Sequence, residues 1–339
     1  MSTFVSLGNF ISINKKLSIP SIAFKLFCCK PLMPRNPLKR LRVVYNYLIL
    51  FRRNNVSNEH ILRSDGDVAI KVVDSNYKVI NLKRKIIQTI FDEENEDKIC
   101  GSLIYKDSST LYEKIWDIDK ENRIITGLFY NGHHPNLNKT KSKILKNRLT
   151  DMFISLLAES DIRNVNARVY AKSLVDLTLE ILDRNSEGIT EKESRYVRNF
   201  LVRIYERFIK NNEERFIQLT LSHGDIKEDN LLVQNNKIVL IDWEFCGFRS
   251  PTFDLIKFKT RFPNFGDDFY SKLNKYLFDK LSNKTKRGNE LIQRYMNNYL
   301  DLFYLEDITL RLIQFENREF AKDFSKIIKF IKRHSNYES

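Results

Sequence analysis

Short apolar runs alternate with polar turns between Asp67 and Tyr130 and predict a region rich in β-strands. Runs of this length that are bounded by turn residues are typical of strands. The five predicted strands are 67–73, 77–82, 85–91, 111–118 and 122–130, joined in part by the turns DSN, KRK and DKE. An acidic stretch at about 93–105 predicts a helix between the third strand and the fourth.

From residue 141 onward the apolar positions recur with the helical period. Helices are predicted for 141–159 and 166–182, and Thr190 with Glu193 forms a capping box before a third helix. The buried stripe of that helix should consist of Tyr196, Val197, Phe200, Leu201, Ile204, Tyr205, Phe208 and Ile209. A strand at 216–222 follows, and aromatic-rich helical segments run from Pro251 almost to the end of the chain.

The first 35 residues show no clear period and contain three prolines. We therefore predict an irregular or peripheral arm. A helix should follow it, with Asn36 as the cap and Pro37 as the first residue, and extend to about Arg53.

The composition is that of a soluble globular protein, with 42% hydrophobic and 29% charged residues among 339. No apolar run reaches the roughly 18 to 20 residues that a membrane span needs, and the N-terminus lacks the features of a secretory signal. The four cysteines show no spacing typical of a metal site. These features lead us to expect a reduced, cytoplasmic compartment.

The net charge of +14 is concentrated near the N-terminus, where residues 1–60 contain ten Lys and Arg but one acidic residue, Glu59. Aromatic residues are interleaved with these cations. Such a segment could adsorb to an anionic membrane, which would place the protein peripherally at its inner face. The alternatives are a solvated basic face over a packed helix and, less favoured, a nucleic-acid-binding surface, for which the chain has no accompanying signature.

The stretch LSHGDIKEDNLLVQNNKIVLIDWEFCGFRSPTFDL, residues 221–255, contains the residue types that phosphoryl transfer requires. A hydroxyl that attacks ATP needs an acceptor for its proton, and Mg²⁺ needs hard oxygen ligands beside the phosphates. Asp225 could accept the proton, and Asn230 with Asp242 could bind the metal. The runs LLV and KIVLI around the turn at 234–236 predict a β-hairpin. That hairpin would return Asp242 to the loop that carries Asp225 and Asn230.

HGDIKEDN followed by IDWE resembles the aminoglycoside phosphotransferase and choline kinase superfamily, which has the protein-kinase-like fold. The resemblance implies an α+β, two-lobed molecule with a small antiparallel β N-lobe and a larger, mostly helical C-lobe. It implies ATP and Mg²⁺ as cofactors and a small-molecule hydroxyl as the acceptor. The implied roles are catalytic base for Asp225, metal ligands for Asn230 and Asp242, and structural support for His223, Glu244 and Asp254. Lys227 departs from the His often found in this family, and a cation there could touch the transferred phosphate.

The sequence offers several candidates for the residues that bind the nucleotide. A lysine should contact the α and β phosphates, held by a glutamate from the following helix. Lys71 in VAIK fits the local sequence, whereas Lys83 and Lys85 fit the strand count. Glu94 is our choice of partner, with the neighbouring Glu93 and Glu96 left open, and no glycine-rich loop is visible.

We therefore predict three parts: a basic arm and helix at 1–60, a β-rich N-lobe at 61–134 that binds the nucleotide, and a helical C-lobe at 135–339. The basic surplus favours a cell-envelope glycan or a lipid-linked sugar as the acceptor. Choline or ethanolamine follows and then an aminoglycoside, a polycation that would need a carboxylate-rich pocket. A catalytically dead kinase fold used as a binding module is the alternative outside enzymology.

Overall fold

The computed structural model describes most of the chain in two compact units. The described residues are 1–7, 10–33, 37–54, 59–72, 76–91, 115–137, 142–212, 216–243, 245–281, 289–316 and 324–335. The first unit comprises residues 1–141 and 227–244, and the second comprises 142–226 and 245–339. Residues 227–244, which contain the predicted hairpin, therefore belong with the β-rich part of the chain.

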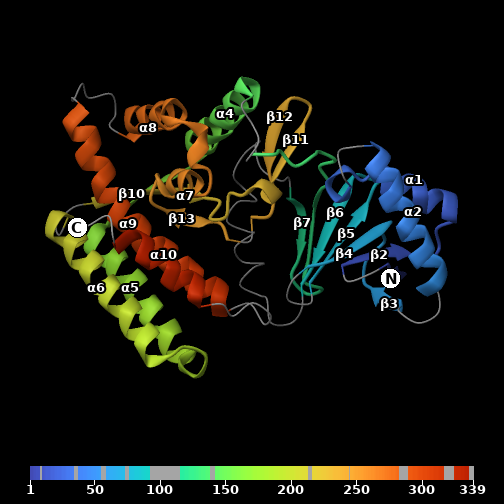
Figure 1. Ribbon diagram of the computed structural model, residues 1–339, viewed down its shortest axis with the longest axis horizontal. Helices are drawn as coiled ribbons and strands as arrows, with labels where there is room; N and C mark the ends of the chain where they lie inside the picture. The colour runs from blue at the N-terminus through green and yellow to red at the C-terminus, as the bar shows by residue number, and fades with distance from the viewer. Residues whose placement is uncertain are drawn as a thin grey trace. The chain divides into compact units, whose positions relative to one another are not determined.

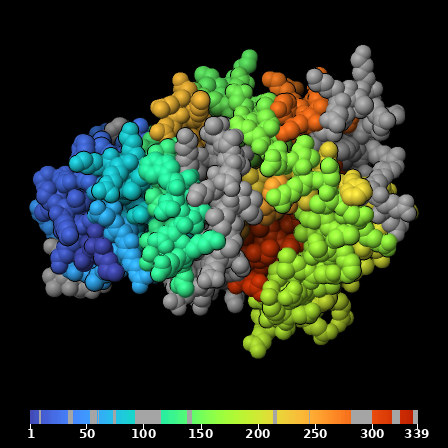
Figure 2. All heavy atoms as spheres, turned by 180° about the vertical axis from the view of Figure 1, so that it is seen from behind, coloured from blue at the N-terminus to red at the C-terminus, as the bar shows by residue number. Residues whose placement is uncertain are grey.

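An antiparallel sheet of eight strands forms the centre of the first unit (Figure 1). Its order is β3-β1-β2-β4-β5-β6-β8-β7. From behind, the blue atoms of the N-terminal residues, the cyan atoms of residues 77–90 and the green atoms of residues 115–128 lie next to one another (Figure 2). The strands are β1 (Ser2–Ser6), β2 (Ile11–Asn14), β3 (Glu59–Leu62), β4 (Val68–Lys71), β5 (Tyr77–Asn81), β6 (Ile86–Ile90), β7 (Ile115–Asp119) and β8 (Ile124–Leu128). All five strands predicted between Asp67 and Tyr130 are present, and the predicted helix at 93–105 lies outside the described residues.

The prediction of an irregular arm at the N-terminus is wrong. β1 and β2 extend the sheet from β4, and helix α1 (Ile19–Cys28) follows them. Proline misled the prediction, because Pro20 occupies the first turn of α1, where a missing N–H costs little. The predicted second helix is confirmed as α2 (Pro37–Asn54).

Helices α1 and α2 pack on the N-terminal part of the sheet (Figure 1). The core between them is apolar and comprises Val5, Leu7, Ile13, Ile22, Leu26, Met33, Val44, Phe51 and Val68. Burial of this set ties the first 54 residues to the sheet. The N-terminal segment is therefore an integral part of the first unit.

The predicted hairpin completes the first unit. It consists of β11 (Leu231–Gln234) and β12 (Lys237–Leu240), and Asn235 and Asn236 in its turn have positive φ. Asn tolerates that conformation better than most residues. The backbone of His133, beyond β8, exchanges two hydrogen bonds with Val233. A Cβ at Gly132 would lie 2.9 Å from the Val233 oxygen, so this close approach needs glycine.

Helices form most of the second unit. They are α4 (Lys143–Glu159), α5 (Ala167–Arg184), α6 (Glu191–Asn212), α7 (Phe253–Arg261), α8 (Asp267–Leu281), α9 (Asn289–Glu316) and α10 (Ser325–Ser335). Thr190 and Glu193 form the predicted capping box at the start of α6. α5, α6, α9 and α10 lie side by side and enclose a large core, to which the predicted stripe of α6 contributes (Figure 1).

A small antiparallel sheet leads to the candidate site. Its order is β13-β10-β9, with β9 at Ile162–Asn166, β10 at Phe216–Ser222 and β13 at Gly247–Arg249. β10 coincides with the predicted strand, whereas β9 and β13 were not predicted. No helix among the described residues has the length and apolar character to cross a membrane.

Candidate functional site

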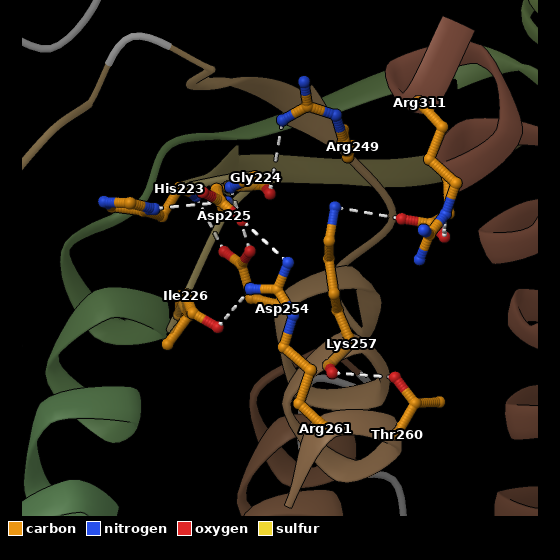
Figure 3. Close-up of polar contacts among 12 residues, drawn as sticks. His223, Gly224, Asp225, Ile226, Arg249, Asp254, Lys257, Thr260, Arg261 and Arg311 are labelled. Atoms are coloured by element: carbon orange, nitrogen blue, oxygen red, sulfur yellow. Dashed lines mark hydrogen bonds and ion pairs between the residues drawn. The ribbon is translucent and has the colours of Figure 1, made fainter. Parts of the chain in front are cut away.

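The loop after β10 is fixed by a buried carboxylate. Asp254, in the first turn of α7, accepts hydrogen bonds from the backbone N–H groups of His223 at 2.7 Å and Gly224 at 3.0 Å (Figure 3). His223 is fully buried, and its Nδ1 accepts from the N–H of Asp225. His223 and Asp254 therefore both accept hydrogen bonds from the backbone of this loop.

Gly224 allows the sharp turn that presents Asp225. Its φ is +82°, and a Cβ there would lie 2.3 Å from the Phe245 oxygen. Both the conformation and the space exclude other residues without rearrangement.

Arg261, the last residue of α7, holds the Asp225 carboxylate. Its Nη2 lies 2.9 Å from Asp225 Oδ1, and its Nη1 donates to the carbonyl of Ile226 at 3.0 Å (Figure 3). The Asp225 side chain is 5% exposed and that of Arg261 is 34% exposed. This pair was not predicted, because 36 residues separate its members and no local spacing links them.

A second ion-pair cluster lies on the α7 side of the loop (Figure 3). Lys257 Nζ is 2.9 Å from Asp307 Oδ1, and Arg311 Nε is 2.6 Å from Asp307 Oδ2. Burial alone would raise the pKa of Asp307, but the charges of Lys257 and Arg311 lower it to about 2. Burial lowers the pKa of Lys257, and Asp307 opposes that shift. The cluster joins α7 to α9.

A third group anchors the segment between β13 and α7. Glu306 of α9 accepts hydrogen bonds from the N–H and the hydroxyl of Ser250, and from the hydroxyl of Tyr170. Burial raises the pKa of Glu306 to about 7 even though these donors oppose the shift. Arg249 donates to Ser222 at the end of β10. The loop around Asp225 is therefore braced from α7, α9 and β13.

In the first unit, Asn230 and Asp242 occupy the open end of the β11–β12 hairpin. Asn230 ends a 3₁₀ turn (Glu228–Asn230), and its carbonyl accepts from the N–H of Ile241 at 3.0 Å. Asp242 follows directly and has a φ of +70°. A non-glycine residue in this conformation is uncommon and often marks a functional position. The hairpin therefore brings these two predicted residues to neighbouring positions.

Lys78 of β5 contacts Asp242. Its Nζ is 2.6 Å from Asp242 Oδ1, and both side chains are about a quarter exposed, at 24% and 26%.

The lysines predicted to bind the nucleotide lie elsewhere. The strand register pairs Ile70 with Lys78 and Lys71 with Tyr77. Since paired residues share a face and successive residues alternate, Lys71 projects from the face opposite to Lys78. Lys83 and Lys85 lie in the exposed turn between β5 and β6.

Lys78 could have been suspected as the single cation within the apolar strand YKVINL. The sequence VAIK at residues 68–71 directed the prediction to Lys71 instead. Lys227 is half-buried beside the 3₁₀ turn, where its carbonyl accepts from Asn230. The predicted Glu94, its alternatives Glu93 and Glu96, and Glu244 lie outside the described residues.

The oxygen donors at the hairpin fit a hard divalent cation. Asn230 offers an amide oxygen and Asp242 a carboxylate, the ligand types that Mg²⁺ takes together with water and phosphate oxygens. In the part of the chain that the structure describes, no group of three His, Cys, Asp or Glu side chains could hold a metal.

Comparisons with known proteins place the fold and the family. A protein-family model described as choline/ethanolamine kinase matches residues 142–336. The solved structure of a choline/ethanolamine kinase family protein from Mesorhizobium loti aligns with a TM-score of 0.53 at 14% identity, covering 77% of this chain and 84% of that chain. The complex of APH(2")-IIia with GDP and kanamycin aligns with a TM-score of 0.51 at 12% identity, covering 78% and 91%.

These structural alignments confirm the predicted protein-kinase-like fold with its antiparallel N-terminal sheet and helical C-terminal region. No curated protein matches the sequence.

Proposed function

The chain belongs to the choline/ethanolamine kinase family and is a small-molecule phosphotransferase, and we propose that it transfers the γ-phosphoryl group of ATP to an acceptor hydroxyl with Asp225 as the base. The observation that carries the proposal is the set of contacts that fixes Asp225: Asp254 holds the preceding turn and Arg261 holds the carboxylate. A carboxylate held in place is suited to accept a proton from a hydroxyl.

In the proposed reaction the acceptor oxygen forms a bond to the γ-phosphorus, and the bond from that phosphorus to the β-phosphate oxygen breaks. The acceptor proton passes to Asp225, and ADP leaves. Asn230 and Asp242 would hold Mg²⁺, which would neutralise charge on the phosphates. Lys227, the residue directly before the 3₁₀ turn, would contribute a further positive charge toward the transferred group.

We assign Lys78 the role of the phosphate-binding lysine, in place of Lys71, because it contacts Asp242. Replacement of Lys78 by Met should raise the dissociation constant for ATP about tenfold or more, the effect of losing a charge-assisted hydrogen bond. Isothermal titration of ATP in the presence of Mg²⁺ would measure it.

Lys71→Met is the matched control, since it removes an exposed lysine from the neighbouring strand and the opposite face. ATP affinity lowered by Lys71→Met but not by Lys78→Met would restore Lys71 as the phosphate-binding residue.

For the acceptor we propose a cell-envelope glycan or a lipid-linked sugar, with choline, ethanolamine or an aminoglycoside as alternatives. Choline would need an aromatic cage. Aromatic rings around α7 instead pack on one another: Phe258 contacts Phe153, Phe262, Phe265 and Phe269 with centroid distances of 4.9–6.0 Å. All five are buried, so they form core rather than a cage. A screen of these five kinds of acceptor with labelled ATP tests the proposal directly.

The rival proposal is a binding module that has lost catalysis. Such a protein should bind nucleotide without producing ADP. Retention of Asp225, Asn230 and Asp242 favours an active enzyme, and a failure to turn over ATP with every acceptor class would favour the binding module.

We also propose that the N-terminal helices contact an anionic membrane, so that a cytoplasmic enzyme would lie at its inner face. α2 exposes Leu38, Leu41 and Tyr45 by 76%, 55% and 65%, and their spacing of three and four residues places them on one side of the helix. Lys39 and Arg42 are exposed among them. Apolar side chains flanked by cations are typical of helices that bind anionic interfaces.

The combined change of Leu38, Leu41 and Tyr45 to Ser should reduce sedimentation with vesicles that contain phosphatidylserine, because it removes the apolar anchor. Substitution is preferable to deletion here, since β1, β2 and α1 contribute to the core. Changing Ile144 and Val169 to Ser provides the control, as these exposed apolar residues lie in the second unit. Equal sedimentation of all three proteins, or sedimentation unaffected by salt, would contradict the membrane proposal.

A further inference from the structure

The cation beside the candidate base has unused capacity to bind a ligand. A guanidinium carries five N–H donors, and Arg261 uses one on Asp225 and one on Ile226. The described residues provide no further partner for it, and its side chain is 34% exposed. The more exposed member of this pair is therefore the guanidinium and not the carboxylate.

The other cations around the loop are engaged elsewhere (Figure 3). Lys257 and Arg311 share Asp307, whose side chain is fully buried. Arg249 donates to Ser222 and lies over the Phe253 ring at 5.1 Å. Arg261 differs from them because its one carboxylate partner is the group that must take up a proton in the proposed reaction.

Proton uptake by Asp225 would remove the negative charge that balances Arg261. An anionic group on the acceptor, bound to the remaining N–H donors, would supply a replacement. A quaternary ammonium group in the same place would instead be repelled by the guanidinium. Arginine also suits phosphate and carboxylate better than other cations do, because its planar fork matches two oxygens at once.

We infer that Arg261 recognises an anionic group, a phosphate or a carboxylate, that the acceptor carries near the hydroxyl to be phosphorylated. This inference rests on the proposed function, since it takes Asp225 as the base. It narrows the acceptor to hydroxyl compounds that are already anionic. Sugar phosphates and the phosphate of a lipid headgroup share this chemistry.

Binding to the ADP and Mg²⁺ complex of the full chain tests the inference, because the nucleotide site is then filled. The probes are glucose 6-phosphate and glycerol 3-phosphate, which represent a sugar phosphate and a lipid headgroup. Glucose, glycerol and choline serve as their uncharged and cationic counterparts. Calorimetry should detect at least one of the phosphorylated probes and show weaker binding of its counterpart. Which phosphorylated probe binds more tightly distinguishes the two sources.

Replacement of Arg261 by Gln should weaken binding of the preferred phosphorylated probe about tenfold or more. Arg261→Lys keeps the charge and should lose less. Lys259→Gln removes an exposed cation from the same helix and is the matched control, for which we expect unchanged binding. Circular dichroism establishes that each variant is folded.

Anion binding that is equal in the wild type and Arg261→Gln would overturn the inference, as would a preference for choline or the absence of binding by both phosphorylated probes. The proposed function fails separately, if Asp225→Ala retains full phosphoryl transfer. Loss of transfer in Asp225→Ala together with unchanged anion binding in Arg261→Gln would therefore refute only the recognition role of Arg261.

Discussion

Replacement of Asp225 by Ala is expected to lower phosphoryl transfer by about a hundredfold to ten-thousandfold, the range for loss of a positioned general base. The physical reason is that the acceptor hydroxyl would lose the group that takes its proton. Asp225 is suited to this role because it is held by Arg261 and by the turn at Gly224 that Asp254 stabilises. The measurement is ADP release with the acceptor that the labelled-ATP screen identifies.

Two comparisons separate loss of the base from damage to the loop. Asp229→Ala removes an exposed carboxylate from the same segment and should leave transfer close to the wild-type rate. ATP affinity should also be preserved in Asp225→Ala, because Lys78, Asn230 and Asp242 are unchanged. Full transfer by a folded Asp225→Ala protein would remove Asp225 from the base role.

Asp225, Asn230 and Asp242 could be proposed from sequence because they lie within 18 residues that form one loop and one hairpin. A hairpin can be predicted from sequence because its strands are close together along the chain. Its turn residues and two apolar runs determine which residues of the strands pair. The structure confirms the hairpin and places Asn230 and Asp242 at its open end. Their roles in metal binding remain predictions.

Lys78 and Arg261 could not be identified in the same way. Lys78 meets Asp242 across 164 residues, and this contact depends on which face of β5 the lysine occupies. Residues 68–71 resemble a lysine-bearing motif, but the register turns Lys71 to the other face. Arg261 is one of many cations on helices after Pro251, and its contact with Asp225 follows from where α7 begins and ends.

The N-terminal strands were missed for a different physical reason. β1 and β2 have five and four residues, too few to show a period reliably, and their stability comes from pairing within the larger sheet. Pro20 and Pro31 are compatible with this structure because they occupy the first turns of α1 and of a 3₁₀ helix (Lys30–Leu32). Tertiary pairing thus overrode a local pattern that favoured an irregular segment.

Replacement of Asp307 by Asn should destabilise the protein by about 3–5 kcal/mol, the cost of leaving a buried charge without its partner. Lys257 is 2% exposed and Asp307 is fully buried, so water cannot replace the lost carboxylate. Urea unfolding followed by circular dichroism measures the change. Asp176→Asn, which breaks the exposed pair with Lys172, is the control and should change stability little.

The double variant Lys257→Met with Asp307→Leu extends this test, because it removes the buried charge along with its partner. Arg311 is partly exposed and can turn to solvent, so we expect the double variant to be more stable than Asp307→Asn alone. A double variant less stable than the single one would show that Asp307 acts through its size or hydrogen bonds and not as the counter-charge of Lys257.

The pH dependence of the wild type provides an independent check on the same cluster. The pKa of Asp307 is lowered from 3.8 to about 2 in the folded protein, so folding favours its ionised form. The stability that Asp307 contributes is therefore fully present above about pH 4 and is lost as the pH falls toward 2. Asp307→Asn should lack this part of the acid destabilisation. The difference in unfolding free energy between wild type and variant should shrink as the pH is lowered from 5 to 2. A difference that stays constant over that range would exclude Asp307 as an ionised partner of Lys257 and Arg311.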